Sequence, residues 1–383
     1  MLTGIKVEVF PTVKQQIYIK QLFGAYRFVF NKCLEFKIEQ YKEYSVNVGL
    51  KEIGSYLHGT LTKSDDTAFL KEHNSKVLVQ SAMQVLEAYK KFFVNHAGFP
   101  NFKSRKNKQS VRFPADAISK NTFIGNRCNF VKQLKGLKFK CSDKYNQILL
   151  ENNGKVKSAT LSQEPNGNYF VSFLVENEPR QLPEPTSSEV LGIDVGIKSF
   201  LVASDGTEIT NPKFTRTNQV KLSKLQRQLS KKVKGSNNRN KARLKLAKFQ
   251  YKINCQKSNF LHNLTTKLIT ENKVIGIEDL NVKGMMKNHK LARSIQELSL
   301  FEFETQLTYK ANRYDRKVIS IDRFYPSSKL CSNCGWKDFD LNLSDRTYQC
   351  LSCGLTIDRD LNASYNIKKE ATRLFELTCL ATK

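Results

Sequence analysis

The chain has 383 residues, with 63 Lys or Arg against 35 Asp or Glu, so its formal net charge is +28. That length allows two or three domains, and a 40% share of hydrophobic residues is enough to build real cores. So large a positive excess repels itself without an anionic partner, and nucleic acid is the expected partner because neutralising phosphates releases condensed cations. A basic soluble enzyme is the alternative. No apolar run approaches the roughly 20 residues of a membrane-spanning helix, so a membrane is not expected.

The N-terminal part of the chain is predicted to be one strand followed by long helices. Residues 5–9 alternate Ile, Val and Val with Lys and Glu, which is typical of a strand rather than a signal peptide. Apolar residues at helical spacing between Ile17 and Leu34 predict a first long helix, and Ser75 is the expected N-cap of a second. Residues 12–97 are therefore interpreted as a helical subdomain.

The segment FPNFKSRKNK, residues 99–108, places aromatic residues among basic ones. Such a pattern suits a surface that tracks a nucleic-acid strand, since bases stack on rings while cations hold phosphates. The alternative is a solvated charge run beside two core phenylalanines. The candidates for nucleic-acid contact in this segment are Phe99, Phe102, Lys103, Arg105 and Lys106.

Residues 110–176 are interpreted as strands, with the clearest hairpin turn at residues 165–168, Pro-Asn-Gly-Asn. Together with the first strand they could form a small barrel. Residues 177–188 contain three of the nine prolines of the chain, so they are the best candidate for a linker between domains.

The second half of the chain alternates strands with helices. Residues 189–206 combine a buried strand, a glycine turn and a second strand. The later elements are expected as a pair of helices in 215–257, a helix near 259–270, a strand at 274–278, a helix near 291–313 and a strand at 317–321. This alternation predicts an α/β sheet.

The very basic residues 215–257 are also candidates for phosphate contacts. Thin apolar stripes on one side of the two expected helices leave the basic side chains on the other side. The residues selected there are Arg227, Lys231, Lys232, Arg239 and Arg243.

Two Cys-x-x-Cys-Gly turns predict a metal site. Cys331 and Cys334 are separated by 15 residues from Cys350 and Cys353, and this spacing is typical of a four-thiolate zinc site. The glycine after each pair permits the positive φ that a tight turn requires. Redox thiols or iron are the alternatives. A site with four protein ligands has no open position, so this ion is expected to be structural.

Three acidic residues are candidates for a catalytic metal site. Asp194 and Glu278 each lie at the end of an apolar strand, and Asp360 lies at the start of a final helix. Phosphodiester hydrolysis can use two divalent ions about 4 Å apart, and Mg²⁺ prefers carboxylates. Each acid alone could instead cap a helix or pair with a lysine. Asp279 and Asp358 are neighbours that could compete, and Asp358 could also orient another group at the site.

Other mechanisms find little support in the sequence. None of the five histidines pairs with a Ser or Cys nucleophile motif, and the chain has no G-x-x-x-x-G-K-[ST] phosphate loop.

Four motifs together resemble a known family. GIDVGIKSFLVASDG, VIGIEDLNV, YPSSKLCSNCG and CGLTIDRDLNASYNI are similar, in order, to the RuvC-like motifs and the inserted zinc ribbon of the TnpB family. These are the transposon-encoded OrfB proteins, relatives of the type V CRISPR nucleases. YRFVFNKCL and YKKFF…GFPNFKS in the N-terminal half also resemble that family.

The resemblance implies an RNA-guided DNA endonuclease. A guide RNA from the transposon end would pair with target DNA next to a short duplex motif. Two Mg²⁺ ions would be held by Asp194, Glu278 and Asp360, and one structural Zn²⁺ by the four paired cysteines. The protein is expected as one copy in a cytoplasmic, nucleoid-associated ribonucleoprotein of a prokaryote, without membrane association.

The implied fold is multidomain, of the α/β and α+β classes. An RNase H-like (RuvC) domain with an inserted four-cysteine zinc ribbon accompanies a small β-barrel wedge domain with an inserted helical recognition lobe. The expected division is wedge strand 1–11, recognition lobe 12–105, remaining wedge 106–185, first RuvC part 186–329, zinc ribbon 330–354 and last RuvC part 355–383.

One departure from the family pattern is Ser364, which replaces the usual alanine in D-x-N-A-A-x-N-I and should be tolerated. Two other functions remain open. The chain could be a catalytically idle RNA-guided DNA-binding protein, although its acidic trio is intact. It could also be a transposase that transfers strands with the same acids, in which case activity would not need RNA.

Overall fold

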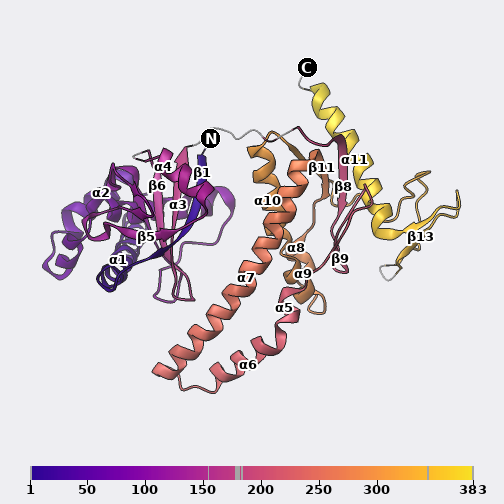
Figure 1. The fold of residues 1–383 in the computed structure, drawn as a ribbon. Helices are drawn as coiled ribbons and strands as arrows, with labels where there is room; N and C mark the ends of the chain where they lie inside the picture. Colours follow the sequence, from indigo (N-terminus) through magenta and orange to yellow (C-terminus); the bar gives the residue numbers. More distant parts are fainter. Residues whose placement is uncertain (1, 154, 177–181, 183, 343–344, 382–383) are drawn as a thin grey trace. The chain divides into compact units, whose positions relative to one another are not determined.

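The computed structural model describes residues 2–153, 155–176, 182, 184–342 and 345–381, which fall into two compact units (Figure 1). The units are Met1–Glu178 and Pro179–Lys383. Their boundary lies within the predicted linker 177–188, of which residues 177–181 and 183 are outside the described residues. No helix among the described residues is long and apolar enough to cross a membrane.

The first unit is built on a seven-stranded antiparallel sheet. Its strands in sheet order are β2 (Gln109–Pro114), β6 (Ser158–Gln163), β7 (Tyr169–Glu176), β1 (Leu2–Phe10), β5 (Leu137–Lys140), β4 (Arg127–Cys128) and β3 (Phe123–Ile124). The predicted N-terminal strand is confirmed, with Ile5, Val7 and Val9 buried on one face. The hairpin at residues 165–168 is also confirmed as the connection between β6 and β7.

This sheet curls until its outer strands share one core. Phe123 on β3 lies 4.9 Å, centroid to centroid, from Phe173 on β7, although three strands separate β3 from β7 in the sheet order. No ladder among the described residues joins β2 to β3, so the predicted barrel is present as a curled sheet with two edges. The α-helix α4 (Asp143–Glu151) and the short 3-10 helices η3 (Ala115–Ala117) and η4 (Lys132–Leu134) interrupt the region 110–176, for which the sequence pattern predicts strands alone.

The helices of the first unit follow the predicted pattern closely. They are α1 (Val13–Tyr44), α2 (Leu50–Ser55), the π-helix η1 (Tyr56–Leu61), the 3-10 helix η2 (Asp65–Glu72) and α3 (Ser75–Asn95). The prediction that Ser75 caps α3 is wrong: the Asn74 side chain accepts hydrogen bonds from the amides of Lys76 and Val77. Ile17, the first residue of the predicted stripe of α1, is exposed because the buried face begins at Ile19.

The second unit contains a five-stranded mixed sheet in the order β10 (Glu208–Thr210), β9 (Ser199–Ala203), β8 (Ser187–Asp194), β11 (Asn272–Glu278) and β12 (Lys317–Ile321). Strands β8, β11 and β12 are parallel, whereas β9 and β10 continue from β8 in antiparallel fashion. The predicted α/β sheet is therefore present. A separate two-stranded ladder pairs β13 (Thr347–Gln349) with β14 (Thr356–Asp358) beside the cysteine turns.

The helices of this unit are α5 (Phe214–Thr217), α6 (Gln219–Ser230), α7 (Asn237–Glu271), α8 (Val282–Met285), α9 (Ala292–Leu298), α10 (Leu300–Arg313) and α11 (Arg359–Ala381). Two predictions are corrected. The helix expected near 259–270 is the C-terminal half of the uninterrupted α7, and the helix expected near 291–313 is broken at Ser299, whose φ is 54°. Helices α6 and α7 form a hairpin whose tip extends away from the sheet (Figure 1).

Candidate active site and metal centre

The acids at the ends of two neighbouring strands point to the same face of the sheet. Strands β8 and β11 are parallel and in register, with Gly192 opposite Gly276 and Ile193 opposite Ile277. Asp194 and Glu278 each follow two residues after their glycine. Since side chains alternate between faces along a strand, each acid shares the face of that glycine. The carboxyl ends of parallel strands meet at one edge, so the two acids are neighbours there.

Helix α11 covers that same face. A Cβ atom added to Gly192 would lie well within 3.0 Å of the Ser364 carbonyl oxygen, and one added to Gly276 would lie 2.5 Å from the Ala371 Cβ. Only glycine permits so close an approach of helix to sheet. Asp360 lies one turn before Ser364, in the first turn of α11. The helix therefore carries Asp360 toward the edge where Asp194 and Glu278 end.

The Asp194 carboxyl is buried, and the other two acids affect its pKa. Burial raises the pKa of the Asp194 carboxyl to about 8, and the carboxylates of Glu278 and Asp360 contribute to that rise, while Arg359 opposes it. Burial also raises the pKa of Glu278, and a hydrogen bond from Ser327 acts against that shift. A site that penalises several carboxylates in this way favours a cation, because a cation removes their mutual repulsion.

The acids are gathered less tightly than the cysteines. In the part of the chain that the structure describes, the four cysteines are the one group of three or more His, Cys, Asp or Glu side chains arranged to hold an ion as they stand. Carboxylates repel one another, which favours separated rotamers. Sharing an ion would thus require side-chain rotations at the three acids.

The two neighbouring acids have other tasks. Asp358 accepts hydrogen bonds from the amides of Asp360 and Leu361, at 2.9 and 3.2 Å, so it caps the start of α11. Asp279 forms an ion pair with Arg323 at 2.6 Å. These interactions occupy both carboxylates, so neither is expected to compete with the three acids for a metal ion. Asp358 also holds in place the helix turn that carries Asp360.

Three polar residues that the sequence analysis did not select hold this site together. The Ser327 hydroxyl donates to the Glu278 carboxylate. The Asn366 side-chain amide donates to the carbonyls of Ser327 and Leu330, both at 2.7 Å, and Asn362 donates to Leu330 at 2.7 Å. Both asparagines are buried on α11. These residues do lie in the family motifs YPSS and NASYNI, but the sequence spacing of the motifs does not indicate which groups they hydrogen-bond.

The four cysteines are brought together as predicted. Their Sγ atoms all lie within 4.8 Å of one another, with Cys331 3.6 Å from Cys353 and Cys334 3.6 Å from Cys350. Tetrahedral zinc with Zn–S bonds of about 2.3 Å requires sulfurs about 3.8 Å apart, so the arrangement fits a zinc ribbon. The glycines after each pair, Gly335 and Gly354, have φ values of 78° and 76°.

The thiols of the cluster differ in their protonation, since burial raises the pKa of Cys350 to about 11. A hydrogen bond from the Leu355 amide, followed by one from the Asn333 side chain, lowers the pKa of Cys353 to about 6. Hydrogen bonds to sulfur favour the thiolate, which is the form that binds metal. Of the other cysteines, Cys33 and Cys128 are buried core residues.

The predicted nucleic-acid residues of the first unit divide by exposure. Arg105 and Lys106 are exposed in a turn, and Phe99 and Phe102 are also exposed. Lys103 is not directed at solvent: its Nζ lies 3.8 Å from the centroid of Phe30 and donates to Gln84 at 2.8 Å.

The predicted residues of the basic hairpin also divide. Arg227, Lys231, Lys232 and Arg243 are exposed along α6, its following turn and α7. Arg239 instead donates to the carbonyls of Leu229 and Lys232 at 3.1 and 2.8 Å, so it closes the turn between the helices. Geometry thus leaves four of these five side chains directed outward.

The fold and the two sites define a two-unit α/β protein in which a four-cysteine ribbon accompanies a sheet edge that carries acidic residues. A solved structure named "Cryo-EM structure of the Cas12f1-sgRNA-target DNA complex" shares this fold, with a TM-score of 0.60 at 12% identity, covering 96% of this chain and 98% of that one. The family models "Probable transposase" (OrfB_IS605), "Cas12f1-like, TNB domain" and "Helix-turn-helix domain" match residues 172–289, 301–367 and 1–45. Residues 2–45 form one strand and a single long helix here.

Two relatives match almost the whole chain. A Streptomyces pristinaespiralis protein named "Putative RNA-guided DNA endonuclease" is 35% identical over 95% of this chain and 88% of its own length. An Escherichia coli K12 protein named "Putative RNA-guided DNA endonuclease InsQ" is 30% identical over 96% of this chain and 91% of its own. The chain belongs to the TnpB/OrfB family of transposon-encoded proteins.

Proposed function

We propose that this chain is an RNA-guided DNA endonuclease whose cutting site consists of Asp194, Glu278 and Asp360. The proposal is supported by the position of Asp194 and Glu278 at neighbouring parallel strand ends, and of Asp360 in the first turn of the helix that covers the same face of the sheet. The raised pKa of Asp194, caused by burial and by the two other carboxylates, supports a site that takes up cations.

The architecture of the second unit supports an RNase H-like, RuvC-type domain. Three strands, β10, β9 and β8, run antiparallel, two parallel strands follow on the other side of β8, and a C-terminal helix crosses the sheet. In the proposed division of the chain, the curled sheet would be the wedge domain, the helices from α1 to α3 the recognition lobe, and residues 330–354 the zinc ribbon inserted before α11.

The three carboxylates fit Mg²⁺, which prefers oxygen ligands. When bound, two such ions would neutralise charge at the scissile phosphate and activate water at neutral pH. The protein contributes orientation: Ser327 holds the Glu278 carboxylate, Asp358 holds the first turn of α11, and the glycines of β8 and β11 let that helix approach.

The Cys331, Cys334, Cys350 and Cys353 thiolates are proposed to hold one structural Zn²⁺. Asn362 joins this ribbon to α11, since it donates to Leu330 and accepts from the Ser332 amide at 2.9 Å. The ribbon and the acidic site are thus connected through the same buried side chains, and folding of one should support the other.

Guide RNA and double-stranded DNA are the proposed partners. A net charge of +28 and the exposed cations of the α6–α7 hairpin support a polyanionic partner. The names of the relatives, and the sgRNA and target DNA in the complex that shares this fold, support a guide-matched DNA target. That the target lies beside a short duplex motif is proposed from the family resemblance alone.

The test compares Asp194→Asn with the parent chain. Each is purified with its RNA, the RNA is sequenced, and a duplex matching the guide is supplied with Mg²⁺. The parent should cut, whereas Asp194→Asn should bind the duplex and lose cutting by at least about 100-fold. Asp205→Asn, an exposed strand-end acid in a turn of the same sheet, is the matched control and should cut like the parent.

The outcomes separate the remaining functions. Binding without cutting by the parent chain would favour the idle binding protein. Joining of strands that survives RNase treatment would favour a strand-transferring transposase. Full cutting by Asp194→Asn would refute the assignment of the site.

A further inference from the structure

A cavity of about 600 Å³ in the first unit has no part in the cutting site. It lies among α1, η2 and the segment after α3, and its volume is within the range of ligand pockets, roughly 300–1,000 Å³. All of its walls belong to one compact unit, so its shape does not depend on how the two units are placed.

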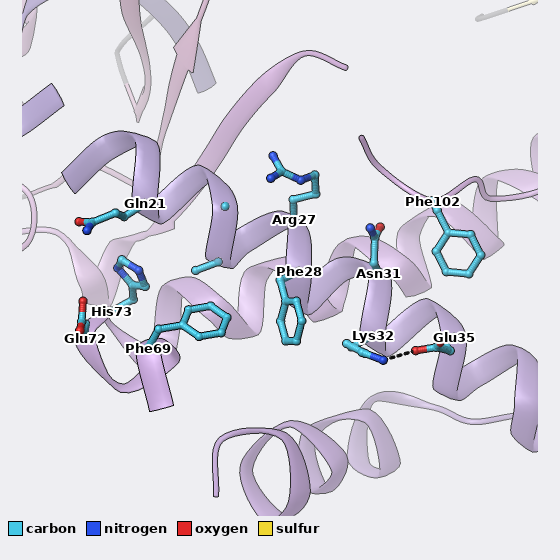
Figure 2. A pocket seen from close by; sticks show the side chains of 12 residues that line it. Gln21, Arg27, Phe28, Asn31, Lys32, Glu35, Phe69, Glu72, His73 and Phe102 are labelled. Atoms are coloured by element: carbon cyan, nitrogen blue, oxygen red, sulfur yellow. Dashed lines mark hydrogen bonds and ion pairs between the residues drawn. The ribbon is translucent and has the colours of Figure 1, made fainter. Parts of the chain in front are cut away.

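Three aromatic rings surround this cavity. Phe28 on α1 and Phe69 on η2 contact each other edge to face, with centroids 5.4 Å apart, and Phe102 enters from a different segment (Figure 2). The Phe102 side chain is 55% exposed although the chain nearby is fixed. Asn31 fixes it by accepting from the Lys103 amide at 2.8 Å and donating to the Lys103 carbonyl at 3.0 Å. The structure therefore holds the Phe102 ring uncovered at the rim of the cavity. Exposure of this apolar ring to water is unfavourable, and a ligand that stacks on the ring would remove it.

The charge of the cavity is balanced, unlike that of the chain as a whole. Arg27 and Lys32 are its cations, and Glu35 and Glu72 are its carboxylates, so its formal charge is zero. Lys32 already forms an ion pair with Glu35 at 2.7 Å. Burial lowers the pKa of His73, which keeps that ring neutral. A phosphate would gain little here, whereas a neutral, planar, polar group would fit.

Polar side chains around the rings have hydrogen-bonding groups left over for a neutral, planar, polar ligand. The Gln21 carboxamide, exposed on α1, makes no side-chain hydrogen bond within the described residues. Arg27 donates one of its five N–H groups to the Gln109 side chain at 3.0 Å, which leaves the others for a ligand. His73 contributes wall rather than hydrogen-bonding capacity, because its Nδ1 is buried beyond the reach of a ligand in the cavity.

We propose that this cavity holds one unstacked nucleobase, with a phenylalanine ring against its face and the amide and guanidinium groups at its edge. The inference rests on the proposed function, because it takes the ligand from the nucleic acid that the chain binds. Every base has an apolar face and a polar edge, and base-on-ring stacking tolerates any sequence. The base could come from guide RNA or from target DNA, and the experiment distinguishes them.

The first measurement is ultraviolet cross-linking of the full chain with its copurified RNA and a guide-matched duplex, followed by mass spectrometry of tryptic peptides. Nucleotide adducts are expected on Phe102 within residues 92–103, or on residues 28–32 and 64–71, which carry Phe28 and Phe69. The sugar mass of the adduct identifies RNA or DNA. No adduct on any of these cavity peptides, with adducts elsewhere in the same sample, would overturn the proposal.

The second measurement is affinity, made in the Asp194→Asn background so that no DNA is lost to cutting. Phe102→Ala should weaken binding of the copurified RNA, or of the guide-matched duplex, by about tenfold, the loss of one stacked base. Phe93→Ala removes an exposed ring from α3 of the same unit but outside the cavity, and should leave affinity unchanged. Equal affinities for both variants would overturn the proposal.

The outcomes also separate this inference from the proposed function. If adducts and the Phe102 effect appear but the parent chain does not cut, the endonuclease proposal fails and the base site stands. If the parent cuts while both measurements are negative, the base site fails alone. Thermal melting of each variant, expected within about 2 °C of the parent because both rings are largely exposed, excludes loss of folding.

Discussion

Substitution of Gly276 by alanine should separate helix α11 from the sheet. The added Cβ would lie 2.5 Å from the Ala371 Cβ, and an ordinary contact begins at 3.4 Å, so the gap is short by 0.9 Å. Ala371 has no rotatable bond that could yield, so the backbone of α11 must move. Overpacking of this kind costs about 1–3 kcal/mol. For the second unit that corresponds to a fall in Tm of about 2–12 °C.

The same shift should reach the cutting site, because Asp360 lies on α11. Misplacement of a catalytic group by about 1 Å can cost about 100-fold in rate. Gly276→Ala should therefore lose cutting of a guide-matched duplex out of proportion to its loss of stability. The control is Gly4→Ala, a strand glycine whose added Cβ would meet nothing within 4 Å.

A substitution at Ala371 should compensate for the clash that Gly276→Ala introduces. Ala371→Gly alone should cost about 1 kcal/mol through helix propensity, but it also removes the atom that Gly276→Ala meets. The double variant should thus be more stable than the sum of the singles by about 1 kcal/mol or more, measured by thermal and denaturant unfolding. Additive effects, or a Gly276→Ala chain that melts and cuts like the parent, would refute the packing argument.

Three further changes test other parts of the molecule. Asn366→Ala removes the side-chain donor to the Ser327 carbonyl, whereas the Leu330 carbonyl keeps the hydrogen bond from Asn362, so we expect about 1–3 kcal/mol of destabilisation and slower cutting through Ser327, measured by melting and cleavage rate. Cys353→Ser should lose the single zinc per chain in elemental analysis, whereas Cys255→Ser, an exposed thiol on α7, should retain it. Burial lowers the pKa of Lys310 from 10.5 to about 8, so the unfolded chain holds more protons between these pH values and stability should rise with pH there by up to about 3 kcal/mol. Lys310→Met should lose this rise in pH-dependent unfolding.

Local patterns predicted the parts of the molecule that depend on neighbours in sequence. The alternation at residues 5–9 predicted β1, and the hairpin turn at 165–168 predicted the β6–β7 connection, because each pattern acts within one element. The Cys-x-x-Cys-Gly turns predicted a four-thiol cluster for the same reason: each turn sets two sulfurs by itself.

Predictions failed where a distant contact or a single competing side chain decided the outcome. Asn74 rather than Ser75 caps α3, since a carboxamide one residue earlier reaches the free amides. The break at Ser299 depends on a left-handed backbone that residue type alone does not indicate. Among the basic candidates, Lys103 and Arg239 turn inward because Phe30 and the carbonyls of the α6–α7 turn accept them.

The sequence by itself predicted most of the strands and long helices, the thiol cluster and the three acids that are proposed to act together. Only the tertiary structure decided that they share a face, because that depends on the register of β8 with β11 and on the two glycines that admit α11. Register and helix-to-sheet distance arise from contacts between residues that are tens of positions apart. No local pattern encodes such contacts, and packing alone brings Asp360 to the strand ends.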